Sequence, residues 1–189
     1  VVPFGGINPI MSTNPFAFSM PGSEINPVSS DFAISTIAAG KIAVAKANNT
    51  PLPDGAIIDS DGHASRNPDD FYAGGALLPA AGPKGSGMGI IAELVGNAML
   101  GSALEFNWLI ICMRVDAFQP ISQYKVAVSK LSKQVRKSSP ATGHQKVLMP
   151  GDLEEKKYQD CVNSGYVSVS NNIAKLLIDA AQSVGQKGW

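Results

Sequence analysis

A glycine-rich segment with a single lysine is the part of this sequence best suited to chemistry. Residues 78–89 read LPAAGPKGSGMG, and an apolar pattern typical of a helix follows directly. Glycine lets the main chain approach an anion closely, and the start of a helix offers unpaired N–H groups and the positive end of its dipole. Lys84 adds a full positive charge. The segment therefore predicts a site for a phosphate-bearing ligand.

The same glycines have a second interpretation. The phosphate loop of nucleotide-binding enzymes needs a Lys followed by Ser or Thr, and the common dinucleotide fingerprint needs the spacing G-x-G-x-x-G. Gly85, Gly87 and Gly89 fit neither pattern. A glycine-rich turn can also serve only to pack a helix tightly on a strand. The segment by itself leaves both interpretations open.

Other kinds of catalytic or metal site find little support. There is no G-x-S-x-G motif, and the only two histidines, His63 and His144, lie in turn-like sequence where an imidazole is usually solvated. Residues 59–70 place oxygen-bearing side chains at the spacing of a calcium loop, but Ala64 stands where that loop needs glycine and Asp70 where it needs glutamate. We therefore interpret Asp59 as a turn residue and predict no metal site.

Composition limits the class of protein and its partners. The chain has 189 residues, of which 44% are apolar and 16% charged, and its 15 basic residues balance 15 acidic ones. The absence of a basic block argues against nucleic acid, and the absence of an apolar run of about 18 residues argues against a membrane span. Two cysteines indicate a reducing compartment, so the cytoplasm is expected. The start lacks the features of a signal peptide and reads like a chain entered in its middle.

Strand-like and helix-like patterns alternate along the chain, which predicts an α/β fold with a mixed sheet. Helices are expected at residues 32–48, with Ser30 or Asp31 as N-cap, and then at 87–100, 121–137, 153–163 and, capped by Ser170, up to Val184. Strands are expected at residues 16–20, 27–30, 56–58, 107–113, 146–149 and 166–169. The run 107–113 is continuously apolar, as in a strand buried on both faces.

Five separated motifs together carry a resemblance to a known family. They are residues 12–17 (STNPFA), 31–35 (DFAIS), 52–62 (LPDGAIIDSDG), 78–94 with the glycine loop, and 148–152 (LMPGD). In this order the chain resembles the type-2 malate/L-lactate dehydrogenase family, which includes sulfolactate and ureidoglycolate dehydrogenases and cyclic-imine reductases. The resemblance covers nearly the whole chain, but only about the second half of a family member.

The resemblance implies a non-Rossmann NAD(P)-binding fold with a mixed sheet, a homodimer, and reversible hydride transfer between NAD or NADP and a small 2-oxo or 2-hydroxy acid or a related imine. Residues 1–115 would form part of the NAD(P)-binding domain, and residues 116–189 would complete the domain formed with the first half. The family's proton-transferring His and its carboxylate-binding Arg lie in that first half. No catalytic residue is therefore expected in this chain, which should turn over poorly or not at all alone. The alternative is a non-catalytic binding or dimerisation module derived from such an enzyme.

The resemblance also implies roles for individual residues. Thr13 matches a position beside the substrate, and seven further residues match positions near the cofactor: Asp31, Phe32, Ala33, Pro83, Lys84, Gly151 and Asp152. Each has a plainer alternative. The Thr13 hydroxyl could only satisfy a turn, Asp31 and Asp152 could be helix N-caps, and Lys84 could be a solvated surface lysine.

The glycine loop also departs from the family pattern in places. Ala81 stands where a second glycine is common, Pro83 where a polar residue is common, and Ser86 where an aromatic residue usually sits. Asp152 replaces a more usual glutamate. These changes remove a hydrogen-bond donor and a stacking ring near the cofactor, so the preference between NAD and NADP stays open.

Overall fold

The structure, a computed structural model, describes residues 1–23, 26–101 and 107–186. The chain divides into two compact units. Unit 1 comprises Val1–Phe16, Ala33–Leu109 and Ser168–Trp189, and unit 2 comprises Ala17–Phe32 and Ile110–Val167. Each unit is therefore assembled from segments that lie far apart in the sequence.

The core of unit 1 is built around a small antiparallel sheet. Strand β3 (Ile57–Ile58) lies between β4 (Ala64–Ser65) and β5 (Ala76–Leu77), with Ile57 opposite Leu77 and Ile58 opposite Ala76. Because successive strand residues point to opposite faces, Ile57 and Ile58 enter two different apolar clusters. The larger cluster also contains side chains from distant segments: Met11, Ile34, Ile42, Leu52 and Leu77.

Unit 1 also contains four described α-helices. They are α1 (Ala39–Ala47), α2 (Pro68–Tyr72), α3 (Pro83–Glu93), which continues into the π-helical turn η1 (Leu94–Met99), and α6 (Asn171–Ser183). Ile42 of α1 is fully buried in the core. Ser170 caps α6 as predicted, since its hydroxyl accepts a hydrogen bond from the Ile173 amide. The Asn172 side chain then ties α6 to the end of α1 by donating to the Ala47 carbonyl at 2.6 Å.

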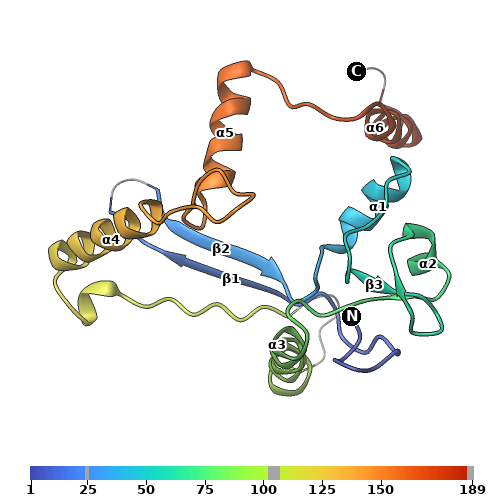
Figure 1. Ribbon diagram of the computed structural model, residues 1–189, viewed down its shortest axis with the longest axis horizontal. Helices are drawn as coiled ribbons and strands as arrows, with labels where there is room; N and C mark the ends of the chain where they lie inside the picture. Colours follow the sequence, from blue (N-terminus) through green and yellow to red (C-terminus); the bar gives the residue numbers. More distant parts are fainter. Residues whose placement is uncertain (24–25, 102–106, 187–189) are drawn as a thin grey trace. The chain divides into compact units, whose positions relative to one another are not determined.

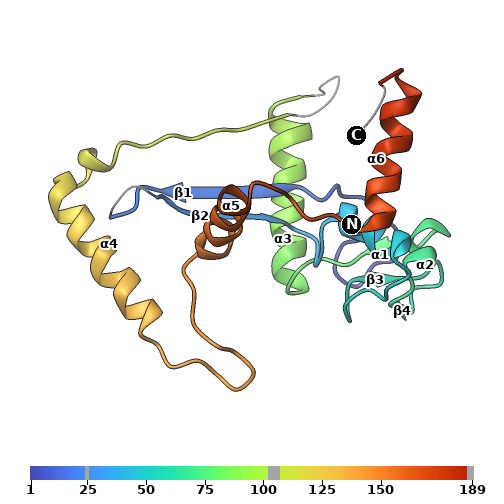
Figure 2. The ribbon, with the colours of Figure 1, turned by 90° about the horizontal axis from the view of Figure 1, so that it is seen from above.

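Unit 2 contains most of a two-stranded sheet and two long helices. Strands β1 (Pro15–Met20) and β2 (Val28–Ala33) lie side by side in both views (Figures 1 and 2). The short 3-10 helix η2 (Val115–Ala117) is followed by α4 (Ile121–Arg136) and α5 (Asp152–Ser164). Tyr124 of α4 is buried, and its hydroxyl donates to the Pro21 carbonyl at 2.8 Å, which fixes α4 to the segment after β1.

Several predicted elements differ from the structure. Residues 32–33 end strand β2 and α1 begins only at Ala39, so the predicted helix over 32–48 is wrong in its first part, because pairing with β1 extends this segment. Residues 107–113 form no strand and are exposed, with Trp108 at 78% and Ile110 at 75% exposure. Residues 146–149 and 166–169 also form no strand. The predicted helices at 121–137 and 153–163 are confirmed to within one residue at each end.

The α/β character is confirmed, but the described strands form two small sheets in place of the one mixed sheet expected. The predicted domain boundary between residues 115 and 116 assumes that the first half of a family member completes the second domain. The boundary therefore stays a prediction. No helix within the described ranges is long and apolar enough to cross a membrane.

Candidate functional site

The glycine-rich loop enters α3 through two consecutive residues with positive φ. Ala81 and Gly82 have φ values of 52° and 59°, and Pro83 is the first residue of the helix. The chain thereby folds back, and loop carbonyls accept hydrogen bonds from the first amides of the helix: Lys84 N to Ala81 O at 3.4 Å, Gly85 N to Ala80 O at 3.0 Å, and Ser86 N to Gly82 O at 3.1 Å. The expectation of unpaired N–H groups here is therefore wrong, because Pro83 has none and the next amides are paired.

Of the glycines at positions 85, 87 and 89, two serve close packing. A Cβ atom at Gly85 would lie 2.2 Å from the Ala80 carbonyl oxygen and 3.0 Å from that of Ile34. One at Gly89 would lie 2.8 Å from the Met11 sulfur. At Gly87, in contrast, no atom lies within 4 Å of such a Cβ. The packing interpretation of the glycines thus applies to Gly85 and Gly89, which let α3 approach the segment around Ile34.

Lys84 is the charged group that the loop presents. Its side chain is exposed, and it forms neither a hydrogen bond nor an ion pair among the residues that the structure describes. The carboxylate of Glu93, at the other end of α3, is in contrast hydrogen-bonded to several donors. Lys84 is therefore free to meet an anion.

A cavity of about 440 Å³ lies against the same loop within unit 1. Its walls include Pro79, Ala81 and Gly82 from the loop, Phe4 and Gly6 from the start of the chain, and Thr36. Glycines and apolar side chains dominate this lining, so a ligand would meet mainly backbone and apolar surface there. Lys84 follows the cavity wall by two residues.

The turn that carries Thr13 is held by its neighbours and not by the Thr13 side chain. Asn14 has a left-handed φ of 36°, and its side-chain amide donates to Glu93 Oε1 at 2.9 Å. The Ser12 amide donates to the same oxygen at 2.9 Å. Thr13 is half-buried, and within the described chain its hydroxyl makes no hydrogen bond. The hydroxyl is thus not used by the turn and is available to a ligand.

Segment 34–36 connects this turn to the glycine loop. The Ile34 amide donates to the Thr13 carbonyl at 2.9 Å, and the Ile34 carbonyl accepts from the Ala80 amide at 2.8 Å. Thr36 continues the pairing by donating to Leu78 O at 2.9 Å. The structure therefore brings Thr13, the Ala33–Ile34 backbone and the start of α3 together within unit 1.

The other predicted cofactor residues belong to unit 2. Asp31 is an exposed residue of strand β2, and the N-cap of α1 is Ala38, so the interpretation of Asp31 as a helix cap is wrong. Phe32 stacks on Phe18 of the neighbouring strand, with ring centroids 6.4 Å apart. Gly151 has a left-handed φ of 93° and lies near this sheet, since a Cβ on it would be 3.7 Å from the Pro27 carbonyl oxygen.

Asp152 is the first residue of α5, and Gly151 is its N-cap, which corrects the interpretation of Asp152 as the cap. Its carboxylate accepts two hydrogen bonds from Arg136, at 2.7 and 3.1 Å, and one from the Met149 amide at 2.9 Å. Arg136 is the main reason that the pKa of Asp152 lies below its ordinary value. The carboxylate is committed to linking α4 and α5.

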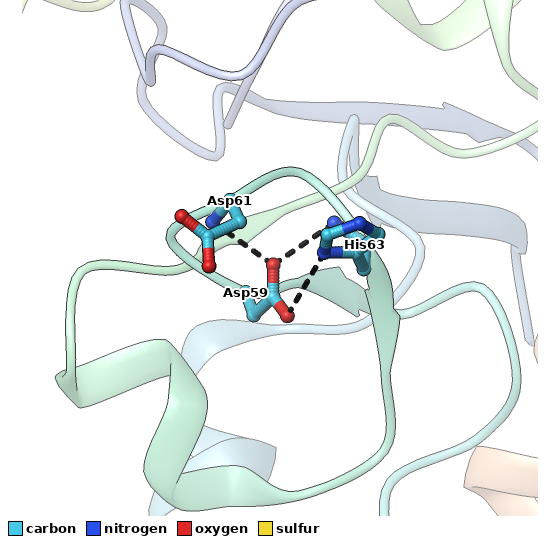
Figure 3. A group of neighbouring side chains, drawn as sticks. All are labelled: Asp59, Asp61 and His63. Carbon is cyan, nitrogen blue, oxygen red and sulfur yellow. Dashed lines mark hydrogen bonds and ion pairs between the residues drawn. The ribbon is translucent and has the colours of Figure 1, made fainter.

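The Asp59 carboxylate satisfies backbone amides of the turn before β4, as predicted. Asp59 Oδ1 accepts hydrogen bonds from the amides of Asp61 at 3.0 Å and His63 at 2.9 Å, and the His63 ring lies 3.6 Å from Asp59 Oδ2 (Figure 3). The bond from the His63 amide is the largest cause of the lowered pKa of Asp59. The carboxylate thus satisfies the backbone of its own turn.

Sequence analysis missed the role of Glu93. The only local signal is its spacing of four from Asn97, whose side chain donates to Glu93 Oε2 at 2.5 Å. The contacts with Ser12 and Asn14 join residues about 80 positions apart, so no local pattern could reveal them.

Comparisons with known proteins identify relatives in the family that the five motifs resemble. A family model described as malate/L-lactate dehydrogenase matches residues 1–177. L-sulfolactate dehydrogenase of Methanocaldococcus jannaschii is 31% identical over 169 residues, which are 82% of this chain and 48% of that protein. Ureidoglycolate dehydrogenase (NAD(+)) of Escherichia coli O157:H7 is 28% identical over 195 residues, 95% of this chain and 55% of the relative. (2R)-3-sulfolactate dehydrogenase (NADP(+)) of Chromohalobacter salexigens is 34% identical over 107 residues, 57% and 32% of the two chains.

A solved structure of sulfolactate dehydrogenase from Methanocaldococcus jannaschii superimposes with a TM-score of 0.75 at 26% identity. The match covers 98% of this chain and 56% of that one. The chain thus spans about half the length, or less, of the curated relatives it matches.

Proposed function

The chain belongs to the malate/L-lactate dehydrogenase family, and we propose that it is part of an oxidoreductase that interconverts a 2-hydroxy acid and a 2-oxo acid by hydride transfer with NAD or NADP. The family is enzymatic, and relatives of this chain are NAD(+)- and NADP(+)-dependent dehydrogenases. The bound nicotinamide would supply or accept the hydride. The residues of this chain would bind and orient the two reactants.

One observation carries the proposal: Lys84, exposed and without a side-chain partner among the described residues, follows a glycine-rich loop that forms part of the wall of a cavity. A cofactor phosphate needs a cation and a close backbone approach, and the loop offers both. Because the first amides of α3 are paired within the loop, the Lys84 ammonium, and not the helix end, would supply the attraction. These residues fit a dinucleotide.

Thr13 is the proposed contact to the substrate. Its hydroxyl is half-buried and without an intramolecular partner in the part of the chain described here, so it can donate to a carboxylate or keto oxygen. The described histidines do not favour a proton transfer from this chain, since His63 lies in the Asp59 turn and His144 is exposed. We assign the proton donor to a part of the enzyme that this chain does not contain.

Further parts of the proposal rest on family membership. Ala33 and Pro83 would be further cofactor contacts in unit 1, and Asp31, Phe32, Gly151 and Asp152 are the positions of unit 2 that the resemblance assigns to the cofactor. The fold would not be of the Rossmann type. The complete enzyme would be a homodimer in the cytoplasm. Both cysteines, Cys112 and Cys161, are free thiols, which supports a reducing compartment.

A fluorescence titration with NADH and NADPH in parallel tests the proposal. Tryptophan is excited and energy transfer to the bound nicotinamide is recorded; Trp108, at 78% exposure, is the described donor. Saturable transfer is expected, and Lys84→Ala should weaken it about three- to tenfold because an exposed charged contact is lost. Lys125→Ala, on the exposed surface of α4, is the matched control and should bind as the wild type does. A folded protein that shows no transfer with either cofactor would contradict the proposal.

Turnover gives a second test. The chain alone should not oxidise NADH in the presence of pyruvate or oxaloacetate, because the proposal places the proton donor elsewhere. Clear turnover, followed at the nicotinamide absorbance, would show that this chain supplies the donor itself.

The alternative is a non-catalytic binding or dimerisation module derived from such an enzyme. The observation in its favour is apolar surface: Ile90, Ile91 and Leu94 on α3 and η1 are about half exposed, and Ile110 is 75% exposed. Sedimentation of the chain across concentrations, with and without NADH, separates the two functions. Strong self-association without any NADH binding would favour the module.

A further inference from the structure

We propose that Glu93 is a positioning residue, whose carboxylate holds the turn 12–14 on α3 and so fixes the direction of the Thr13 hydroxyl. The inference rests on the proposed function, because it concerns the residue assigned to the substrate. Glu93 itself touches no reacting atom in this proposal. It acts through the turn.

The contacts converge on one carboxylate. Oε1 of Glu93 accepts from the Ser12 amide and from the Asn14 side chain, both at 2.9 Å, so the residues on either side of Thr13 are held by the same atom. Oε2 accepts from Asn97, one helical turn further along. Because an ionised carboxylate has about four acceptor sites, all three bonds can form at once.

The turn needs such a clamp because its backbone is strained. Asn14 is one of three non-glycine residues with a positive φ among the described positions, and its side-chain Nδ2 also donates to the Gly89 carbonyl at 3.3 Å. A left-handed residue other than glycine costs free energy and persists only where its surroundings determine it. Without the Glu93 carboxylate, two hydrogen bonds would still hold the turn: the one from the Ile34 amide to the Thr13 carbonyl, and the longer one from the Asn14 side chain to the Gly89 carbonyl.

The charge state of Glu93 agrees with a positioning role and not with proton donation. Its pKa lies below the ordinary value of 4.5, first because Asn14 donates to it and then because the Ser12 amide does. The groups that face it from the turn and from α3 are these donors and Asn97, together with the amino group of Val1. At neutral pH the carboxylate is therefore ionised and can only accept hydrogen bonds.

Solution NMR of the full chain tests the inference without a ligand. In the wild type, the Ser12 amide and the Thr13 methyl resonance should both titrate with Glu93 below pH 4.5. Glu93→Ala should abolish this titration and speed exchange of the Ser12 amide about tenfold or more, because a charge-assisted hydrogen bond is lost. Glu93→Gln keeps one acceptor oxygen, so it should restore most of the amide protection but not the titration.

Glu155→Gln is the matched control. Glu155 is an α5 carboxylate that accepts a hydrogen bond from Gln159 in the same helix, at 2.8 Å. This variant should leave the Ser12 and Thr13 signals unchanged. The inference would be overturned if the Thr13 methyl resonance of the wild type did not shift as Glu93 titrates. It would also be overturned if the Ser12 amide exchanged at the wild-type rate in a folded Glu93→Ala variant.

A ligand arm links the clamp to the substrate. Oxamate, an unreactive analogue of a 2-oxo acid, is titrated with NADH present, and its binding should shift the Thr13 methyl resonance of the wild type. In Glu93→Ala the affinity for oxamate should fall about tenfold, whereas the affinity for NADH should be unchanged. If oxamate binds both variants equally, the positioning inference fails alone. If neither NADH nor oxamate binds the wild type, the proposed function fails, and the substrate role of Thr13 fails with it.

Discussion

The starts of α3 and α5 share a preceding glycine and differ in the charge of their first residues. Each helix begins directly after a glycine with a left-handed φ, Gly82 before α3 and Gly151 before α5. The α3 start carries a free lysine, whereas the first turn of α5 carries three acidic residues: Asp152, Glu154 and Glu155. The acidic turn already complements the helix dipole, so it disfavours a further anion, while the α3 start favours one.

The difference teaches that a glycine before a helix does not by itself make an anion site. At α3 the first amides are consumed by loop carbonyls, and attraction to a phosphate falls to the Lys84 side chain. At α5 the Gly151 backbone can approach a ligand, but the neighbouring carboxylate is held by Arg136. Which groups remain free at a helix start depends on pairing that only the folded chain shows.

The largest expected effect separates two glycines within α3 itself. Gly85→Ala should destabilise unit 1 by about 2–3 kcal/mol, because overpacking against backbone cannot be relieved by a rotamer change. The new Cβ would lie 2.2 Å from the Ala80 carbonyl oxygen. Urea unfolding followed by circular dichroism, with hydrogen exchange of the Ala80 amide as a local probe, measures the loss.

Gly87→Ala is the matched control in the same helix. Its Cβ would meet no atom within 4 Å, so the substitution should be neutral or stabilise by up to about 1 kcal/mol through helix propensity. Equal effects of the two substitutions would show that the glycines of this loop do not serve packing.

Sequence patterns predicted the elements whose signals are local. The amphipathic helix α4 and the Ser170 cap of α6 depend on periodicity and on a neighbouring amide, and both are confirmed. The helical apolar spacing after residue 33 predicts a helix that begins at Phe32 with Ser30 or Asp31 as its cap, yet strand pairing with β1 decides the conformation of these residues. The run 107–113 was assigned to a buried strand from its composition, which carries no information on what covers it.

The residues of the candidate site stay a prediction from the sequence and its resemblance, whereas the hydrogen bonds around them were not predicted. The sequence identified Lys84 and Thr13, and in the described chain both have free polar groups. It could not show that the α3 amides are already paired, or that Glu93 accepts bonds from both sides of Thr13. These contacts join distant segments, and only the tertiary fold determines them.

An intermediate effect compares the two helix starts directly. Lys84→Ala should weaken NADH binding about three- to tenfold, as stated above, whereas Asp152→Asn should change it by less than about twofold, because the Asp152 side chain is committed to Arg136 and Met149. Both variants are titrated with NADH at low and high salt, and the salt dependence should shrink only for Lys84→Ala. A larger loss for Asp152→Asn would reverse the comparison and show that the Asp152 carboxylate contributes more to cofactor affinity than the Lys84 ammonium does.

The smallest expected effect concerns the stability of unit 2. Because Arg136 lowers the pKa of Asp152, the pair stabilises the folded state above the ordinary value of 3.8, and this contribution is lost as the pH falls through the lower folded pKa. The Arg136 side chain is 52% exposed and that of Asp152 is 24% exposed, so solvent screening limits the contribution to about 0.5–1 kcal/mol. Arg136→Gln should therefore reduce stability at pH 7 by about this amount, and the difference from the wild type should shrink toward pH 3 as Asp152 becomes protonated in the wild type as well. Urea unfolding at the two pH values measures the difference. A gap that stays constant with pH would show that Arg136 stabilises α4 and α5 by packing and not through the charge of Asp152.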